Sequence, residues 1–403
     1  MAEFGQPPGI QYYLVLKIKG NSYNPVNIQY LIIREWIFNI IPTIEIQFDD
    51  VGGYLTEIFP LEDAEDIEIL LGRHQNDANP IELTFSLDDY NVSVKGDNRL
   101  SIVTMTGHLK VDNMFTIKTR AFPTKNSRDV CEQIASEAGL TFSNPHNVTP
   151  FDSMTWYQNS LSNFHFIKHV LKRTFVQDDV VFFFANTSKE FVYTSLNVEI
   201  GKKDIKKSKF SVEGFELNVK NVDDPDDTIW FNSYSIVNNS GYFNKKNCYG
   251  FSYSYYDLEK NIDKDYSAIN KKLVDYSFRN KNLAGQSVDK ISNIDYIERN
   301  LYGEKYFESI MRNQFLKNNF FANSVVLNVN SLSQVKLMDT IDVYIPSLSV
   351  ENESNEVMSG FYLVAGIQHE VTNGGIYTKK LALGRNGMDK SSNNNQESQV
   401  ETK

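Results

Sequence analysis

Two histidines four residues apart, His165 and His169, come closest to the spacing of a metal site. On a helix this spacing places both rings on one face, as in the zinc-binding helix of metalloproteases. Such a helix also needs a glutamate directly after the first histidine, where this sequence has Phe166. No third ligand follows at a local spacing, so we expect packed or surface histidines and predict no metal site.

Other residues that could act in catalysis are not arranged as a recognisable catalytic set. His369 has no partnered nucleophile in sequence, so we expect it to form hydrogen bonds in the core or at an interface, with a general base as the alternative. The sequence has no Gly-x-Ser-x-Gly motif and no phosphate-binding loop. A glycosidase pair stays open, since its separation depends on the fold, but the paired carboxylates occur in turn-like stretches that we interpret as solvated loops. These pairs are Asp49 with Asp50, Glu62-Asp63 with Glu65-Asp66, Asp88 with Asp89, Asp223 with Asp224, and Asp226 with Asp227. We therefore predict no catalytic residue and no cofactor.

The charge pattern argues against a protein that wraps nucleic acid, because the net charge is −11. A basic segment at residues 202–209 is interpreted as a solvated linker, with phosphate contact as the alternative, but no aromatic residues alternate with its lysines. Cys131 and Cys248 are far apart and are expected to be buried, reduced thiols. No run of eighteen apolar residues predicts a membrane span, and the N-terminus does not have the pattern of a secretory signal.

The most regular pattern lies between Val335 and Gly387 and predicts three strands. Apolar residues alternate with polar ones from Ile341 to Ile345, and two longer alternating runs flank the turn residues at 373–375, which predicts a hairpin. Glycine inside a strand costs stability. Gly366 and Gly384 therefore predict bulges or places where another backbone comes close.

The rest of the chain predicts strands towards both ends and helices between them. The N-terminal strands are expected at 11–18, 28–36, 44–48, 67–71, 81–87 and 100–109, which favours a barrel or sandwich. Helices are expected from a cap at Asn126 or Ser127 to Gly139 and over 160–175, followed by a hairpin of 180–184 and 191–196. Later strands are expected at 210–219, 228–237, 249–255 and 324–329, with mainly helical structure over 257–320, including 291–301.

The C-terminal pattern resembles central baseplate hub proteins of contractile-tailed, T-even-like phages. Related families are the late control D family and the N-terminal hub part of type VI secretion spikes. The resemblance extends over about residues 10–386. Its pattern positions are Asp339, Gly360, Tyr362, Val364, Gly366, His369, Gly375, Tyr377, Leu381 and Gly384.

The resemblance implies an α+β, mainly β fold with two tail-tube-like β-barrels, the second split by an insertion, and a helix-rich middle region. The expected division is an N-terminal arm (1–9), a first barrel (10–119), a middle domain with a β-hairpin (120–209), a split second barrel (210–256 and 321–386), a mixed helical insertion (257–320) and a disordered tail (387–403).

The function that the resemblance implies is structural and non-enzymatic. A homotrimeric ring would adapt the six-fold tail tube to the three-fold central spike and enclose the DNA channel, in the baseplate of a virion assembled in the host cytoplasm. The implied partners are the central spike protein and the tail tube protein, with tape measure and baseplate wedge proteins as further candidates. DNA would pass without specific binding, and three copies would carry a formal charge of −33, three times −11, to repel it.

The sequence departs from spike-fused relatives, because no oligosaccharide-binding-type barrel or repetitive β-helix follows Gly387. We therefore expect the spike, and any lysozyme activity, on another polypeptide. Two other functions stay open: a tail-associated cell-wall hydrolase, and a carbohydrate-binding module for host adsorption.

Overall fold

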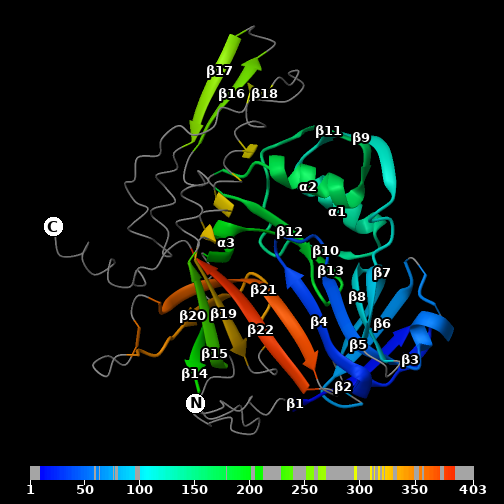
Figure 1. The fold of residues 1–403 in the computed structure, drawn as a ribbon. Coiled ribbons are helices and arrows are strands. Elements are labelled where there is room, and N and C mark those ends of the chain that lie inside the picture. The colour runs from blue at the N-terminus through cyan, green and yellow to red at the C-terminus, as the bar shows by residue number, and fades with distance from the viewer. Residues whose placement is uncertain are drawn as a thin grey trace.

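A computed structural model describes most of the chain and shows a mainly β protein, as the sequence predicts. The described residues are 10–58, 60–62, 64–75, 77, 80–95, 100–177, 179–200, 205–211, 228–238, 251–257, 262–268, 295–296, 309–310, 313, 316–317, 320–321, 323–329, 334–348, 354–355, 358–372 and 376–385. Figure 1 shows an N-terminal sheet and a second group of strands side by side, with the helices above them.

The N-terminal sheet is antiparallel throughout, in the order β4-β5-β8-β7-β6-β2-β3. Its strands are β2 (Tyr13–Ile18), β3 (Asn21–Tyr23), β4 (Ile28–Trp36), β5 (Thr43–Val51), β6 (Asp66–Gly72), β7 (Ile81–Lys95) and β8 (Leu100–Leu109). Alternate residues such as Leu16, Ile46 and Ile69 are buried in one core, which is the period-two pattern of a half-buried strand. The six predicted strands are confirmed, and β7 runs further than expected.

Two short helical turns border this sheet. The 3₁₀ turn η1 (Pro25–Asn27) joins β3 to β4, and Asn24 caps it by accepting the Val26 N–H at 3.1 Å. The π-helical turn η2 (Tyr54–Ile58) follows β5.

Six strands form a closed barrel, in the circular order β14-β15-β19-β22-β21-β20 and back to β14. They are β14 (Ile205–Phe210), β15 (Ile229–Asn238), β19 (Asn323–Val329), β20 (Thr340–Val343), β21 (Gly360–Thr372) and β22 (Ile376–Arg385). The predicted strands at 228–237, 324–329 and 341–345 and the C-terminal hairpin are thereby confirmed. Leu327, Ile341, Leu363 and Leu381 are fully buried in the barrel's core.

The basic segment at 202–209 is not a linker over its described part, and the prediction there was wrong. Residues 205–210 form β14, which closes the barrel by pairing in parallel with both β15 and β20. Ser208 is buried, whereas Lys206 reaches Asp339 at 3.1 Å and Lys209 lies over the Trp230 ring. Lysine stems can cover apolar surface while their charges stay in water, so a barrel strand can be rich in lysine. The strand expected at 210–219 therefore begins earlier, and residues 212–227 lie outside the described residues.

The segment between β15 and β19 contains a separate small sheet. β16 (Phe251–Asp257) pairs antiparallel with β17 (Ile262–Ala268) and parallel with β18 (Asp295–Tyr296), and not with the barrel to which residues 249–255 were assigned. β18 also interrupts the helix that was expected over 291–301. Most of that helix lies outside the described residues.

The middle of the chain folds as predicted into two helices and a hairpin. The helices are α1 (Ser127–Glu137) and α2 (Asn163–Arg173), with a short α3 (Leu196–Ile200), and the strands are β9 (Ile117–Lys125), β10 (Thr141–Ser143), β11 (Met154–Ser162), β12 (Val181–Ala185) and β13 (Glu190–Ser195). Asn126 caps α1 by accepting the Asp129 N–H at 2.9 Å. Gly139, at φ +70°, follows the helix in the left-handed conformation that glycine allows.

Glu137, at the end of α1, joins this helix to β9. Its carboxylate accepts hydrogen bonds from Arg120 (2.6 Å), Lys118 (2.9 Å) and Gln133 (3.0 Å). Partial burial works to raise the pKa of Glu137, but these hydrogen bonds outweigh burial and lower the pKa from 4.5 to about 2. The fold therefore favours the ionised carboxylate.

Glu137→Gln is expected to remove stability that the protein has above about pH 4.5 and loses as pH falls towards 2. We expect a loss of roughly 1–2 kcal/mol at pH 7, at the low end for bonds to charged groups because the side chain is 25% exposed. Urea unfolding measures the free energy of unfolding of both proteins. The difference between the variant and the wild type should become smaller below pH 4. The control is Glu132→Gln, which changes an exposed pair with Arg128 on the same helix. The same pH dependence in both variants would contradict the assignment.

Candidate functional site: the junction between the N-terminal sheet and the barrel

Strand β21 belongs to both the closed barrel and the N-terminal sheet. Its first residues, Gly360 to Leu363, pair with β20 inside the barrel. Its later residues, Gly366 to Thr372, pair antiparallel with β4. Because β22 follows β21 along its other edge, the two units form one continuous sheet, as Figure 1 shows for β4, β21 and β22.

Gly366 lies where β21 changes partner. A β-bulge occurs between Val364 and Gly366, which confirms the bulge predicted from the glycine. A Cβ at Gly366 would lie 2.0 Å from Cε3 of Trp36 and 3.3 Å from the carbonyl oxygen of Glu35. The Trp36 ring therefore occupies the space that any other side chain would need. The sequence predicted that another backbone could come close to Gly366. The nearest group is instead the Trp36 ring, and the Glu35 carbonyl oxygen lies farther away.

A buried polar network crosses the same junction. Glu35 of β4 and His369 of β21 are only 4% and 5% exposed, and Nε2 of His369 lies 3.1 Å from Oε1 of Glu35. Nδ1 of His369 lies 2.7 Å from the Tyr377 hydroxyl. Because a carboxylate only accepts hydrogen bonds, Nε2 of His369 donates to Glu35, and Nδ1 pairs with the Tyr377 hydroxyl. The predicted hydrogen-bonding role of His369 is confirmed.

Glu35 also connects the junction to the middle of the chain. Thr187, in the β12–β13 turn, donates its backbone N–H to Oε2 of Glu35 at 2.8 Å and its hydroxyl to Oε1 at 3.2 Å. A second tie lies nearby, where Ala185 donates its N–H to the carbonyl of Ile40 at 2.7 Å. One carboxylate therefore holds the N-terminal sheet, the barrel and the middle region together.

The rim of this network has further buried groups. Tyr377 stacks on Tyr12 at 4.2 Å, and burial raises its pKa well above the ordinary value. Burial lowers the pKa of Lys379 to about 8, an effect that the charge of Glu35 partly offsets. Lys379 thus stays mostly protonated at neutral pH.

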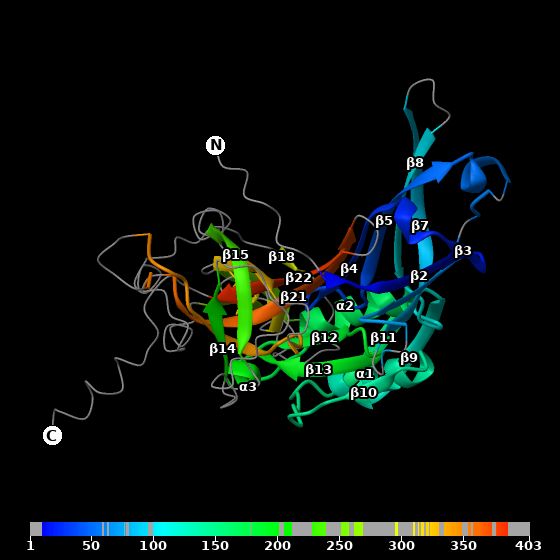
Figure 2. The ribbon, with the colours of Figure 1, turned by 90° about the horizontal axis from the view of Figure 1, so that it is seen from below.

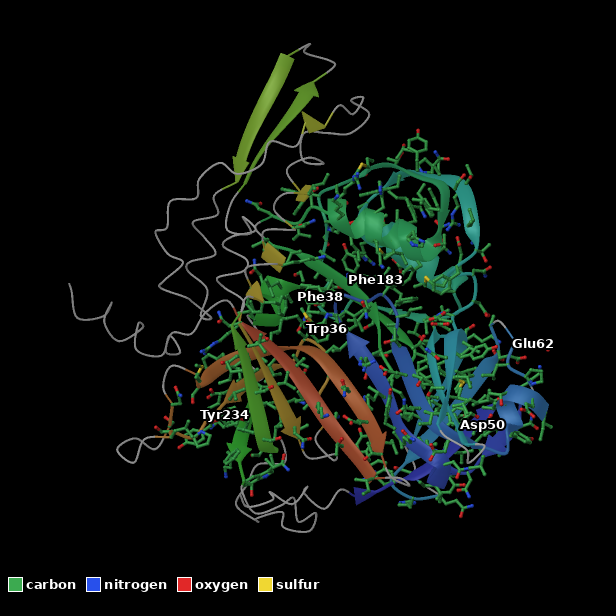
Figure 3. All side chains as sticks on the ribbon, in the orientation of Figure 1. Trp36, Phe38, Asp50, Glu62, Phe183 and Tyr234 are labelled. Carbon is green, nitrogen blue, oxygen red and sulfur yellow. The ribbon has the colours of Figure 1, made fainter. Side chains whose placement is uncertain are left out.

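Aromatic side chains connect the three parts of the molecule, and two of them, Trp36 and Phe38, are 36% and 37% exposed. Phe38 contacts Trp36 (5.9 Å), Phe182 (5.9 Å) and Phe321 (5.0 Å), measured between ring centroids. Phe321 packs against Gly384, where a Cβ would lie 2.2 Å from its ring. Figure 3 labels Trp36 and Phe38 close to where the N-terminal sheet, the barrel and the middle region meet.

The remaining pattern positions lie in the barrel wall. Asp339 accepts the Lys336 N–H, Tyr362 donates its hydroxyl to the Met358 carbonyl at 2.7 Å, and Gly360 has a φ of +124°. Val364 and Leu381 are fully buried. Gly375 lies outside the described residues. The described pattern positions thus stabilise the barrel and its junction, and their use as an inter-chain interface stays a prediction.

Comparison with known proteins identifies this arrangement as a fold found in phage tails. No protein-family model and no curated protein sequence matches the chain. The structure is similar to a 43 kDa tail protein of prophage MuSo2 from Shewanella oneidensis, with 10% identity, a TM-score of 0.57 and coverage of 93% of this chain and 98% of that one. It is also similar to a tail protein from Neisseria meningitidis MC58, with 8% identity, a TM-score of 0.56 and coverage of 94% and 98%. A type VI secretion component of E. coli matches at a TM-score of 0.47, with 9% identity over 92% of this chain and 76% of that one.

The fold is therefore similar to that of these two tail proteins. At 8–10% identity the likeness establishes the fold and leaves the role open. In the described part of the chain, no helix is long and apolar enough to cross a membrane.

The histidines that could have suggested a metal site have other partners. His165 lies 2.8 Å from the hydroxyl of Ser162, the cap of α2. His169 lies 3.0 Å from Arg173, and burial lowers the pKa of His169 to about 4. Among the described residues no three His, Cys, Asp or Glu side chains gather as a metal site would require. Cys131 is a buried free thiol, as predicted, and Cys248 lies outside the described residues.

The paired carboxylates are not all solvated loops, and that interpretation was wrong for two pairs. Asp49 and Asp50 lie in β5, and Asp88 and Asp89 lie in β7. Asp50 is 3% exposed and accepts the N–H groups of Leu55 (3.0 Å) and Thr56 (3.2 Å), so it stabilises η2. The N–H groups that Asp50 accepts lie five and six residues further along the chain, beyond a turn. A pair of neighbouring aspartates in the sequence gives no sign of such a contact. Glu62 and Glu65 do form surface ion pairs with Lys19, and residues 63 and 223–227 lie outside the described residues.

Gly366→Ala is expected to destabilise the protein by about 1–3 kcal/mol, because the added methyl group overlaps the Trp36 ring. Urea unfolding measures the change. In a Trp36→Ala background the same substitution should cost much less, since the overlapping ring is absent. An equal cost in both backgrounds would show that the contact does not restrict position 366.

Glu35→Ala is expected to cost about 2–4 kcal/mol, because it leaves the Thr187 N–H and His369 without their acceptor. Hydrogen exchange should also speed up at the Thr187 amide, a readout specific to the tie between parts. The control is Glu45→Ala, which removes a 29% exposed partner of Arg34 and Tyr30 and should cost about 1 kcal/mol, less than Glu35→Ala. Similar losses for the two variants would contradict a special role for Glu35.

Proposed function

We propose that this chain is a non-enzymatic structural subunit of a contractile phage tail, the baseplate hub. Three copies would form a ring that adapts the six-fold tail tube to the three-fold central spike and encloses the DNA channel. The observation that carries the tail assignment is the likeness to two tail proteins, one of them from a prophage, over more than nine-tenths of this chain and 98% of each of theirs. The trimer, the spike and tube proteins as partners, and assembly in the host cytoplasm are parts of the proposal.

An exposed strand edge supports assembly into a ring. β6 pairs with β7 only from Ile81 to Ser86, and no described strand covers that edge of β7 beyond Leu87. The buried part of β7 also ends at Leu87, because all side chains from Asp88 to Val94 are exposed. Figure 2 shows the β7–β8 hairpin standing out from the rest of the molecule.

The side chains on this edge favour a protein partner over solvent. Tyr90, Val92 and Val94 alternate along the strand and so share one face, and Val94 is 70% exposed. Soluble proteins usually protect an open edge with charges, prolines or a covering segment, because it can pair with another strand. In a closed ring a neighbouring copy would cover each such edge, which is how cyclic assemblies remove open surfaces.

The double substitution Val92→Asp and Val94→Asp is expected to prevent ring assembly while leaving the fold intact, because both side chains are exposed in the free chain. Native mass spectrometry should give three times 46.3 kDa for the wild type, alone or with the candidate spike protein, and a single chain for the variant. The matched control is Leu348→Asp, which places a charge at a 94% exposed site in the loop after β20 and should leave the trimer intact.

Two outcomes would contradict this proposal. A wild-type chain that stays monomeric with and without the spike protein would exclude the ring. A variant that still forms trimers would place the contact elsewhere than at β7. Circular dichroism of the variant separates loss of assembly from loss of fold.

A further inference from the structure

A second open strand edge lies in the barrel. β15 pairs with β14 only over residues 229–231, although it continues to Asn238. Its opposite edge is paired with β19 as far as Asn238. No described strand therefore covers the β14 side of β15 over residues 232–238. β7 has a matching open stretch at residues 88–94, where no described strand pairs with the edge that β6 covers earlier.

Both open stretches are almost without the usual protection of a strand edge. Residues 90–94 and 232–238 contain no charged residue and no proline. Only Asp88 and Asp89, at the start of the open stretch of β7, carry a charge. Natural proteins usually place charges or proline along an open edge to prevent it from pairing with another chain. These two edges are therefore suited to pairing with a strand.

On β7 the apolar side chains of the open stretch lie on the core face of the sheet. Tyr90 lies opposite Met105 and Val92 lies opposite Val103, and both of these β8 residues are fully buried. Directly opposite residues share one face, so Tyr90 and Val92 continue the rows of core residues. They are nevertheless 42% and 36% exposed. The core of the N-terminal sheet is thus open to solvent at this edge.

β15 shows the same division of side chains. Tyr234 and Ile236 are partly buried and pack against the core of the barrel. Ser233, Ser235 and Val237 alternate with them and are exposed. A strand added to this edge would place one row of its side chains beside Tyr234 and Ile236. The open stretches of β7 and β15 therefore both have an apolar row on their core face.

The two open edges lie on opposite sides of the molecule. Figures 1 and 2 both show β15 on the left and β7 on the right. Figure 3 labels Tyr234 on the side of the barrel that is away from the N-terminal sheet. A neighbouring copy can therefore present its β15 to β7 without the two strands of one copy competing for each other.

The directions of the two strands also match. Every neighbouring pair is antiparallel along the series β7, β8, β5, β4, β21, β22, β19 and β15. Strand direction reverses at each step of this even-numbered series, so β15 runs opposite to β7. Rotation about a ring axis that runs along the strands does not change their directions. It therefore brings β7 of one copy and β15 of the next copy together as an antiparallel pair.

We propose that the open edge of β7 in one copy pairs antiparallel with the open edge of β15 in the next copy. This inference rests on the proposed ring and names the two strands that close it. The contact is head-to-tail, because each copy contributes two different edges. Closure of three copies would leave neither edge open.

The register that pairs both open stretches over their full length places residues 88–94 opposite residues 238–232. Tyr90 then lies opposite Ile236 of the next copy, and Val92 lies opposite its Tyr234. Pairs of an aromatic and a β-branched residue stabilise antiparallel sheets. The apolar rows of the two copies therefore join on the core face.

Disulfide cross-linking of the full chain, in a Cys248→Ser background, tests the contact. In the proposed register Asn91 lies opposite Ser235 of the next copy. Cα atoms of such pairs are about 4.5–5.5 Å apart, which a disulfide can span. Asn91→Cys combined with Ser235→Cys should therefore give bands at two and three times 46.3 kDa on a non-reducing gel after oxidation.

The matched control moves one cysteine by two residues along the same edge. Asn91→Cys combined with Ser233→Cys places the cysteines diagonally, about 7–8 Å apart, and should give at least fivefold less cross-linked product. Asn91→Cys alone should give no band at three times the chain mass. Equal cross-linking by the two pairs would overturn the proposed register.

A charge exchange tests the same pairing without cysteines. Val237→Asp would face Asp89 of the neighbouring copy, and like charges directly opposite destabilise a strand pair. The variant should weaken the trimer several-fold in native mass spectrometry over a concentration series. Adding Asp89→Lys should restore it. Both positions are exposed in the free chain, so circular dichroism should stay unchanged.

The outcomes separate this inference from the proposed ring. A wild-type trimer without cross-linking between positions 91 and 235 would overturn the pairing and leave the ring in place. Failure of Asp89→Lys to restore assembly of the Val237→Asp variant would do the same. A wild-type chain that stays monomeric, with and without the spike protein, would overturn both the ring and the pairing.

Discussion

The structure depends on a buried carboxylate that none of its three parts could satisfy alone. Glu35 lies in β4, yet its partners come from β21 and from the β12–β13 turn. An unpaired buried carboxylate would cost far more than the few kcal/mol by which proteins are stable. The N-terminal sheet can therefore keep this residue buried only when the barrel and the middle region are in place. The strand pairing of β4 with β21 and the contact of Trp36 with Gly366 fix the same arrangement sterically.

Much of the secondary structure could be predicted from the sequence, because it depends on local pattern. The alternation in β4 and β22, the cap at Asn126 and the turn before β22 are signals within a few residues of each other. The glycine at 366 also predicted an unusual site correctly. The sequence did not show why glycine is required at position 366. The residue that excludes a side chain there is Trp36, which lies in the N-terminal sheet, far away along the chain.

Two of the errors had a common physical origin, which is that charge was interpreted as exposure. β14 carries lysines yet closes the barrel, because its backbone pairs on both sides and its lysine stems cover the wall. Asp50 was assigned to a solvated loop, yet it is buried because a turn presents N–H groups to it.

The separation of Glu35 from His369 along the chain has a consequence for biosynthesis. The two residues are 334 positions apart. At about 5–20 residues per second, the ribosome needs roughly 17–67 s to reach His369 after it has made Glu35. Throughout that interval the β4 edge lacks its β21 partner, and the Glu35 carboxylate lacks His369. The nascent chain thus presents an open strand edge for up to about a minute, and such an edge can pair with another strand.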